Sequence, residues 1–184
     1  LGNKFLANIR ETDAIVQVVR CFENDDIIHE LGTVDPLRDI EIINAELILA
    51  DHAALEKRKI SREKKARSGD KEAKKELALM EKLLPHLDNG KPAITASIND
   101  DEQEIMKEFF LLTSKRTIFA CNVSEDELAN ALDNPDDHPM VSKVKSYAHE
   151  THGADAIVIS ARIEEELIDL SNEEANEFLQ DMGI

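Results

Sequence analysis

The residues with the clearest chemistry stand at the end of a short apolar run. Thr117 to Cys121 reads as a buried strand, and Asn122-Val123-Ser124-Glu125 follows it directly. Guanine offers two adjacent donors, N1–H and N2–H, which a short carboxylate accepts together, whereas adenine places an acceptor at N1 beside its N6 donor. Because Glu125 is longer than Asp by one C–C bond, about 1.5 Å, its fit to guanine is weaker. The motif indicates a nucleotide site that need not prefer GTP.

Asn-x-x-Glu alone is a weak signal, because the same pattern also describes a strand-end turn with solvated side chains. Two further segments favour a nucleotide site. Residues 1–22 read as a helix that leads into a buried strand, and Ala156 to Ser160 reads as another strand that ends in Ser160-Ala161. This order resembles that of P-loop nucleotide hydrolases of the GTPase type, in which a strand ending in Asn-x-x-acid reads the base and the next strand ends in Ser-Ala.

The resemblance extends to a particular family, since further matching segments lie throughout the chain. Together they resemble the YchF family of Obg-like ATPases. The resemblance implies a cytoplasmic protein that prefers ATP to GTP, hydrolyses it and associates with ribosomes. The matching segments are Gly2–Leu6, Arg10–Ala14, Val19–Phe22, Asp35-Pro36 with Asp39-Ile40, Asn122–Glu125 and Glu177–Gly183.

The same resemblance implies a role for each residue of the base site. Asn122 would tie the base loop to the P-loop through its amide, and Val123 would offer backbone groups to the adenine edge. Glu125 would take the place of the usual specificity Asp, while Ser160 and Ala161 would add backbone contacts from the next strand. Since Glu125 alone cannot match both N1 and N6 of adenine, backbone groups must supply the remaining donor or acceptor.

The chain departs from a complete family member in what its sequence lacks. The 184 residues contain no Gly-x-x-x-x-Gly-Lys-Ser/Thr loop, no Asp-x-x-Gly segment for Mg²⁺ and no β-rich TGS domain. We therefore expect the chain to be an internal part of a longer protein. Phosphoryl transfer depends on positioned phosphates, the P-loop Lys and Mg²⁺. ATP or GTP with Mg²⁺ is expected in the intact protein, and this polypeptide alone is expected neither to bind a triphosphate tightly nor to hydrolyse it.

Composition excludes several other classes of protein. Hydrophobic residues make up 42% and charged residues 33%, as in an ordinary globular protein. No apolar run approaches the roughly 20 residues of a membrane-spanning helix, so no membrane partner is expected. Cys21 and Cys121 are expected to be reduced core residues. His149 and His152 are read as surface residues, because no acid or Cys completes a metal site with them, and no catalytic triad is predicted.

Charge is strongly segregated along the chain. Residues 57–75 carry a net charge of +7 in a chain of net −17, so the remaining residues together carry −24. A basic tip on an acidic body is typical of a protein with a phosphate-rich partner, although a solvated, Lys-rich hairpin would read the same. No aromatic residue interrupts the segment, so we expect contacts to RNA phosphates and no DNA sequence specificity. The basic residues are Lys57, Arg58, Lys59, Arg62, Lys64, Lys65, Arg67, Lys71, Lys74 and Lys75.

The basic tip belongs to a predicted antiparallel, coiled-coil-like helical hairpin. Asp35-Pro36 predicts a helix start, and apolar residues then recur at spacings of three and four. Ser68-Gly69-Asp70 breaks the run, with Gly69 suited to a helix end and Asp70 to a new N-cap. The two apolar seams consist of Ile40, Ile43, Leu47, Ala50 and Ala54, and of Leu77, Met80, Leu84 and Leu87.

The rest of the chain alternates between strands and helices, which predicts an α/β fold with a parallel sheet and flanking helices, part of a P-loop GTPase-type sheet. A nucleotide-binding domain is expected over residues 1–34 and 89–184, interrupted by the hairpin at 35–88. Residues 90–98 are expected to be a re-entry linker and 130–139 a polar loop. Strands are predicted near 14–20, 117–121 and 156–160, and helices over 101–112, 141–152 and 171–182.

Two functions from different classes fit these observations. The first is the base-recognition half, with its helical insertion, of an ATP-binding and ATP-hydrolysing Obg-like NTPase that associates with ribosomes. The second is a noncatalytic module that binds RNA, the ribosome or a protein through the basic hairpin, with the sheet as a scaffold. Glu125→Asp would test the first, and charge reversal at the tip would test the second.

Overall fold

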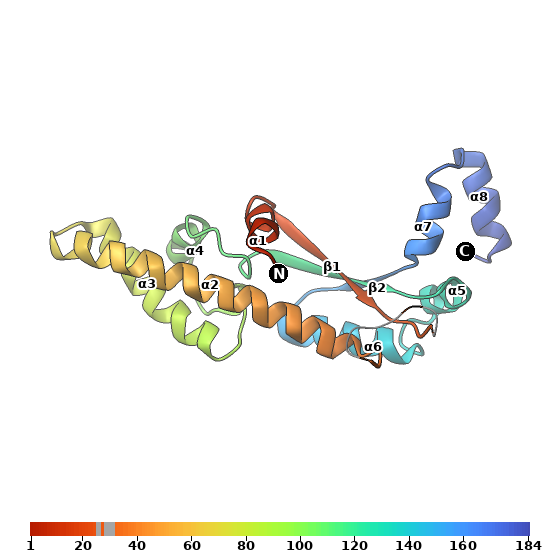
Figure 1. Cartoon of the computed structure of the whole chain (residues 1–184), viewed down its shortest axis with the longest axis horizontal. Coiled ribbons are helices and arrows are strands. Elements are labelled where there is room, and N and C mark those ends of the chain that lie inside the picture. The colour runs from red at the N-terminus through yellow and green to blue at the C-terminus, as the bar shows by residue number, and fades with distance from the viewer. Residues whose placement is uncertain (25–26, 28–31) are drawn as a thin grey trace. The chain divides into compact units, whose positions relative to one another are not determined.

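In a computed structural model that describes residues 1–24, 27 and 32–184, the chain forms two compact units (Figure 1). The hairpin unit comprises residues 1–15 and 41–116, and the sheet unit comprises residues 16–40 and 117–184. The expected nucleotide-binding segment 1–34 includes residues 25–26 and 28–31, which lie outside the described residues.

The sheet has three strands in the order β1-β2-β3. β2 and β3 pair in parallel, with Phe119 opposite Ala156 and Asn122 opposite Ile159. The expected parallel α/β fold is therefore confirmed, and each predicted strand lies within one or two residues of its expected position. The strands are β1 (Ala14–Arg20), β2 (Arg116–Asn122) and β3 (Ala156–Ile159).

Helices alternate with these strands in the sheet unit. The predicted polar loop at 130–139 was partly wrong, because α5 continues to Asp133 and buries Leu128 and Ala131. α6 begins earlier than predicted, at Pro139, since the His138 ring accepts a hydrogen bond from the N–H of Val141 and caps the helix. The elements are α5 (Glu125–Asp133), α6 (Pro139–Tyr147), the π-helical turn η2 (Ala148–His152), α7 (Ala161–Leu167) and α8 (Asn172–Asp181).

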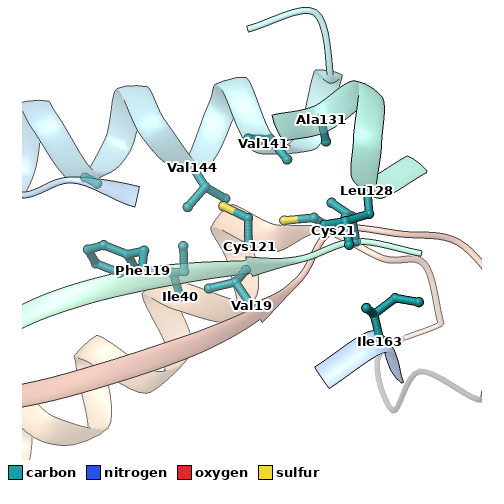
Figure 2. Close-up of a cluster of buried hydrophobic side chains, with 12 residues drawn as sticks. Val19, Cys21, Ile40, Phe119, Cys121, Leu128, Ala131, Val141, Val144 and Ile163 are labelled. Carbon is teal, nitrogen blue, oxygen red and sulfur yellow. The ribbon is translucent and has the colours of Figure 1, made fainter. Parts of the chain in front are cut away.

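The core of the sheet unit lies between the strands and α6. Figure 2 shows the side chains of Cys21 and Cys121 in this core near Val141 and Val144 of α6. Both cysteines are free and fully buried, as expected. Hydrogen bonding between the two thiols and their burial raise the pKa of Cys21 far above its usual range, so this thiol stays protonated.

One of the two histidines read as surface residues is partly buried. His149 is exposed, but the His152 ring packs 5.3 Å from the Phe119 ring, between ring centroids. Burial lowers the pKa of His152, because the charged imidazolium loses solvation there. His152 is therefore a neutral packing residue of the sheet unit.

Two long helices dominate the hairpin unit. Gly69 adopts a left-handed φ of 98° in the turn between them, a conformation that glycine enters without steric cost. Asp70 then accepts the N–H groups of Glu72 and Ala73 at 3.0 and 3.2 Å, so the predicted helix start is confirmed. The helices are α2 (Pro36–Arg67), whose first five residues belong to the sheet unit, and α3 (Lys71–Asp88).

The apolar seam between these helices is broader than predicted. Met80, Leu84 and Leu87 are buried as expected, but so are Leu79 and Leu83. On α2, Leu47, Ile48, Asp51 and Leu55 are buried, while Ile43, Ala50 and Ala54 are only half-buried, as is Leu77 on α3. Ile40 is buried as well, but in the core of the sheet unit. The seam widens because these helices also pack against other segments of the hairpin unit, including Ala93, Phe109 and Leu111.

The helix predicted over 101–112 is shorter in the structure. α4 ends at Lys107, and Phe110 has a left-handed φ of 51°. The chain turns there because the buried Asp51 carboxylate accepts the N–H groups of Leu112 and Thr113 at 2.8 and 2.7 Å. The other elements of this unit are α1 (Asn3–Arg10), the 3₁₀ turn η1 (Ala93–Thr95) within the expected linker, and α4 (Asp100–Lys107).

Among the described residues, no helix is both long and apolar enough to cross a bilayer.

Candidate functional site

The candidate base site forms where two parallel strands end. β2 ends at Asn122 and β3 at Ile159, and these two residues are partners in the strand register. Carboxyl ends of parallel strands meet at one edge of a sheet, where α/β proteins bind ligands. The following loops, which lead into α5 and α7, therefore lie next to each other.

A side-chain hydrogen bond joins the two loops. Asn122 Oδ1 accepts the N–H of Ala161 at 2.8 Å, and the Val123 N–H donates to the Ile159 carbonyl at 2.9 Å. The Asn122 side chain was expected to contact a P-loop, a segment that these 184 residues do not contain. Among the described residues, its Oδ1 atom ties the base loop to the Ser-Ala loop. The amide thus fixes the spacing of the two loops.

Around this bond lies a pocket of about 420 Å³ within the sheet unit. Of the five residues expected to contact a nucleotide, four line the pocket, and Ala161 does not, although its N–H holds Asn122. Phe22 and Arg162 also line it and were not predicted as site residues. Phe22 is the last residue of a segment that matched the family, and Arg162 directly follows the Ser-Ala pair. The position of each residue beside a matching segment could have marked it as a candidate for the site. The four expected residues are Asn122, Val123, Glu125 and Ser160.

Among the charged residues that line the pocket, Arg162 and Glu125 belong to an ion-pair cluster. Arg162 Nε lies 3.4 Å from Glu125 Oε1 and 3.1 Å from Glu166 Oε1, and Arg162 Nη1 lies 3.5 Å from Glu165 Oε2. Glu125 is 47% exposed and Arg162 62% exposed. The Ser160 hydroxyl is buried and has no hydrogen-bond partner among the described residues. The pocket therefore offers a purine both backbone groups and a carboxylate already paired with a guanidinium.

The ten basic residues of the hairpin tip differ in their exposure and in their partners. Arg58 and Arg62 are engaged within the hairpin unit, because their Nε atoms donate to Glu76 Oε2 at 2.9 and 2.8 Å. Arg58 Nη1 also donates to the Glu108 carbonyl at 2.6 Å, and its guanidinium lies 4.7 Å from the centre of the Phe109 ring. Lys59 is half-buried, and the exposed members of the tip are Lys57, Lys64, Lys65, Arg67, Lys71, Lys74 and Lys75.

Among residues 1–24, 27 and 32–184, no group of three His, Cys, Asp or Glu side chains is placed to hold a metal ion. Glu23, Glu125 and Asp126 all line the base pocket, but they do not form such a group.

The fold and the strand-end site define the class: an α/β protein of the P-loop GTPase type. No family model matches the chain. Over all 184 residues, however, it is 47% identical to the ribosome-binding ATPase YchF of Haemophilus ducreyi, covering 48% of that protein. It is 44% identical to the protein of the same name from Bacillus subtilis, covering 49% of it.

A solved structure is similar as well. The Schizosaccharomyces pombe YchF GTPase superposes on the whole chain with a TM-score of 0.83 and 33% identity, and the chain covers 49% of it. The resemblance to the YchF family is thereby confirmed along all 184 residues. The chain spans about half the length of these relatives.

Proposed function

We propose that this chain is the base-recognition half of an ATP-binding and ATP-hydrolysing Obg-like NTPase. The observation that carries the proposal is the hydrogen bond from Ala161 N–H to Asn122 Oδ1, which holds two strand-end loops around one pocket. Four of the predicted base-contacting residues line that pocket. The relatives named ribosome-binding ATPase support ATP as the nucleotide.

Adenine suits this pocket because its edge needs one donor and one acceptor side by side. The N–H groups of Val123 and Ala161 are already bonded to the Ile159 carbonyl and to Asn122 Oδ1. In this proposal other backbone groups of the two loops supply the donor and the acceptor, whereas the Glu125 carboxylate supplies acceptors only. Phosphate-binding residues and Mg²⁺ belong to the intact protein in this proposal. The 184-residue chain by itself neither binds ATP tightly nor hydrolyses it, which a titration of the isolated chain with Mg²⁺–ATP checks directly.

The test of base recognition is Glu125→Asp in the intact protein. Shortening the side chain restores the bidentate geometry for guanine N1–H and N2–H, so we expect the preference for ATP over GTP to be lost. Equilibrium titration with non-hydrolysable ATP and GTP analogues measures the ratio of the two dissociation constants. An unchanged ratio would move base specificity away from Glu125.

For the hairpin, we propose contact with the ribosome or RNA, in the cytoplasm. The exposed lysines of α2 and α3 and the name of the relatives, ribosome-binding ATPase, support this partner. In this proposal residues 35–88 act as an insertion into a nucleotide-binding domain of residues 1–34 and 89–184. In the alternative function, a noncatalytic binding module, the hairpin makes the same contact but the sheet unit binds no nucleotide. An intact protein that binds RNA and neither ATP nor GTP would establish that alternative.

A further inference from the structure

Arg162 is the one basic side chain that lines the base pocket among the described residues. The helical spacing of α7 places Glu165 and Glu166 one turn beyond it. Arg162 Nε reaches Glu125 Oε1 of the base loop at 3.4 Å and Glu166 Oε1 of its own helix at 3.1 Å. The Arg162 guanidinium therefore bridges Glu125 of the base loop and the helix α7.

Each partner of this bridge, when free, has a preference for guanine. A free Glu carboxylate can accept guanine N1–H and N2–H together, although less well than Asp does. A free Arg guanidinium can donate to guanine O6 and N7 together, which is a common specific contact to that base. Adenine offers neither side chain a matched pair, because its N6 donor stands between the acceptors N1 and N7.

We propose that Arg162 and Glu125 cancel one another's preference for guanine, so that Arg162 is a specificity-determining residue of the base pocket. In the ion pair the carboxylate points its acceptors at the guanidinium, and the guanidinium directs its donors to Glu125, Glu165 and Glu166. The purine then meets mainly backbone groups, which accommodate adenine. This inference rests on the proposed function, because it assumes that the pocket binds a purine nucleotide.

The exposure of Arg162 and Glu125 limits how far a substitution can change the preference between GTP and ATP. Arg162 and Glu125 are 62% and 47% exposed, and exposed ion pairs are weak because water and salt screen them. We therefore expect changes of about three- to fivefold in the ratio of dissociation constants for GTP and ATP. The direction of the change, in single and double variants, is the stronger criterion.

The test is a double-mutant cycle in the intact protein, read by equilibrium titration with non-hydrolysable ATP and GTP analogues. Arg162→Ala frees the carboxylate, so binding of the GTP analogue should strengthen about three- to fivefold relative to the ATP analogue. Adding Glu125→Ala removes that carboxylate, so the ratio should return toward that of the unmodified protein. An unchanged ratio in Arg162→Ala, a shift toward ATP, or no reversal in the double variant overturns the inference.

Matched variants keep the result interpretable. Glu164→Gln changes an exposed carboxylate of α7 that does not line the pocket, and it should leave the ratio unchanged. Arg162→Gln also removes the cation but keeps side-chain bulk, so it should act in the same direction as Arg162→Ala. Thermal unfolding of each variant identifies any loss of fold. If the unmodified protein binds neither analogue, the proposed function fails; if it binds and only the cycle fails, the Arg162 inference alone is wrong.

Discussion

Two carboxylates, one in each unit, show how burial separates a structural polar group from one that faces a ligand pocket. Asp51 of the hairpin unit is fully buried and accepts three hydrogen bonds, from Leu112 N–H, Thr113 N–H and the Thr113 hydroxyl. Glu125 of the sheet unit is about half exposed, and its carboxylate pairs with the Arg162 guanidinium. Asp51 has its acceptors filled by fixed, buried donors, whereas Glu125 pairs with one exposed guanidinium in a pocket that solvent reaches.

The two sites also differ in what removal of a side chain would do. When one partner of a buried hydrogen bond is removed, the other is left buried with neither a protein partner nor water. Each such unsatisfied group costs about 1–3 kcal/mol of stability. An exposed pair is replaced by solvent at little cost. Changes at Asp51 should therefore appear as lost stability, and changes around Glu125 as altered binding.

The largest effect is expected for Asp51→Ala. This substitution leaves the N–H groups of Leu112 and Thr113 buried and without an acceptor, so the hairpin unit should lose about 3 kcal/mol of unfolding free energy. Urea denaturation of the chain, followed by circular dichroism, measures the loss. Asp88→Ala is the control, because its carboxylate pairs with His52 at an exposed position, and it should cost less than about 1 kcal/mol. Equal losses in both variants would contradict the contrast between buried and exposed carboxylates.

The basic tip gives the next largest effect. Reversing charge at Lys64, Lys65 and Arg67 in the intact protein should weaken binding to single-stranded RNA by about 30-fold at low salt and reduce the slope of log affinity against log salt by about 2. Fluorescence anisotropy at several salt concentrations measures both quantities. Undiminished binding would show that the tip is merely solvated.

Arg58 and Arg62 provide the matched comparison for the tip. Both donate to Glu76, so their replacement by Gln should lower the stability of the hairpin unit and leave the salt slope nearly unchanged. A slope as strongly reduced as in the tip variant would mean that these two arginines also contact phosphate.

A smaller effect is expected for Asn122→Ala in the intact protein. Loss of the hydrogen bond to Ala161 N–H frees the two loops of the base pocket, and one such bond corresponds to about a tenfold weaker affinity for ATP. Isothermal titration calorimetry measures the affinity. Asn130→Ala, at an exposed position of α5, should leave it unchanged. If both variants bind ATP equally well, the loop tie does not position the base.

The smallest effect concerns pH. Burial raises the pKa of Asp51 above its usual 3.8, although hydrogen bonds from Thr113 and Leu112 oppose the shift. A carboxyl whose pKa is raised by folding stabilises the fold fully below the unfolded pKa, and this contribution is lost as pH rises through the folded value. Asp51→Asn cannot titrate, so the stability difference between the chain and this variant should change with pH in that window. A pH-independent difference in urea denaturation would contradict the shift.

Local patterns predicted most of the elements. Alternating apolar residues located the three strands, and Gly69 with Asp70 located the turn between α2 and α3, because these signals act over a few neighbouring residues. The early end of α4 was not predictable in this way. It depends on Asp51, whose hydrogen-bond partners lie about sixty residues further along the chain.

The residues of the base pocket likewise include some that the sequence predicted and some that it did not. Asn122 to Glu125 and Ser160-Ala161 were readable as strand-end motifs, and most of them line the same pocket. Phe22 and Arg162 were missed, since neither residue type is diagnostic of a base site by itself. Their part in the pocket becomes visible only when the ends of different strands come together.

The sequence by itself determined the resemblance to the YchF family, the alternation of strands and helices, and the residue types at the base loop and the basic tip, because each is encoded in contiguous segments. Only the tertiary structure decided which polar groups are already satisfied. Asp51, Arg58 and Arg62 find partners distant in sequence, Asn122 finds the N–H of Ala161, and Glu125 finds Arg162. The physical reason is that burial and hydrogen-bond geometry depend on the packing of remote segments, which no local pattern specifies.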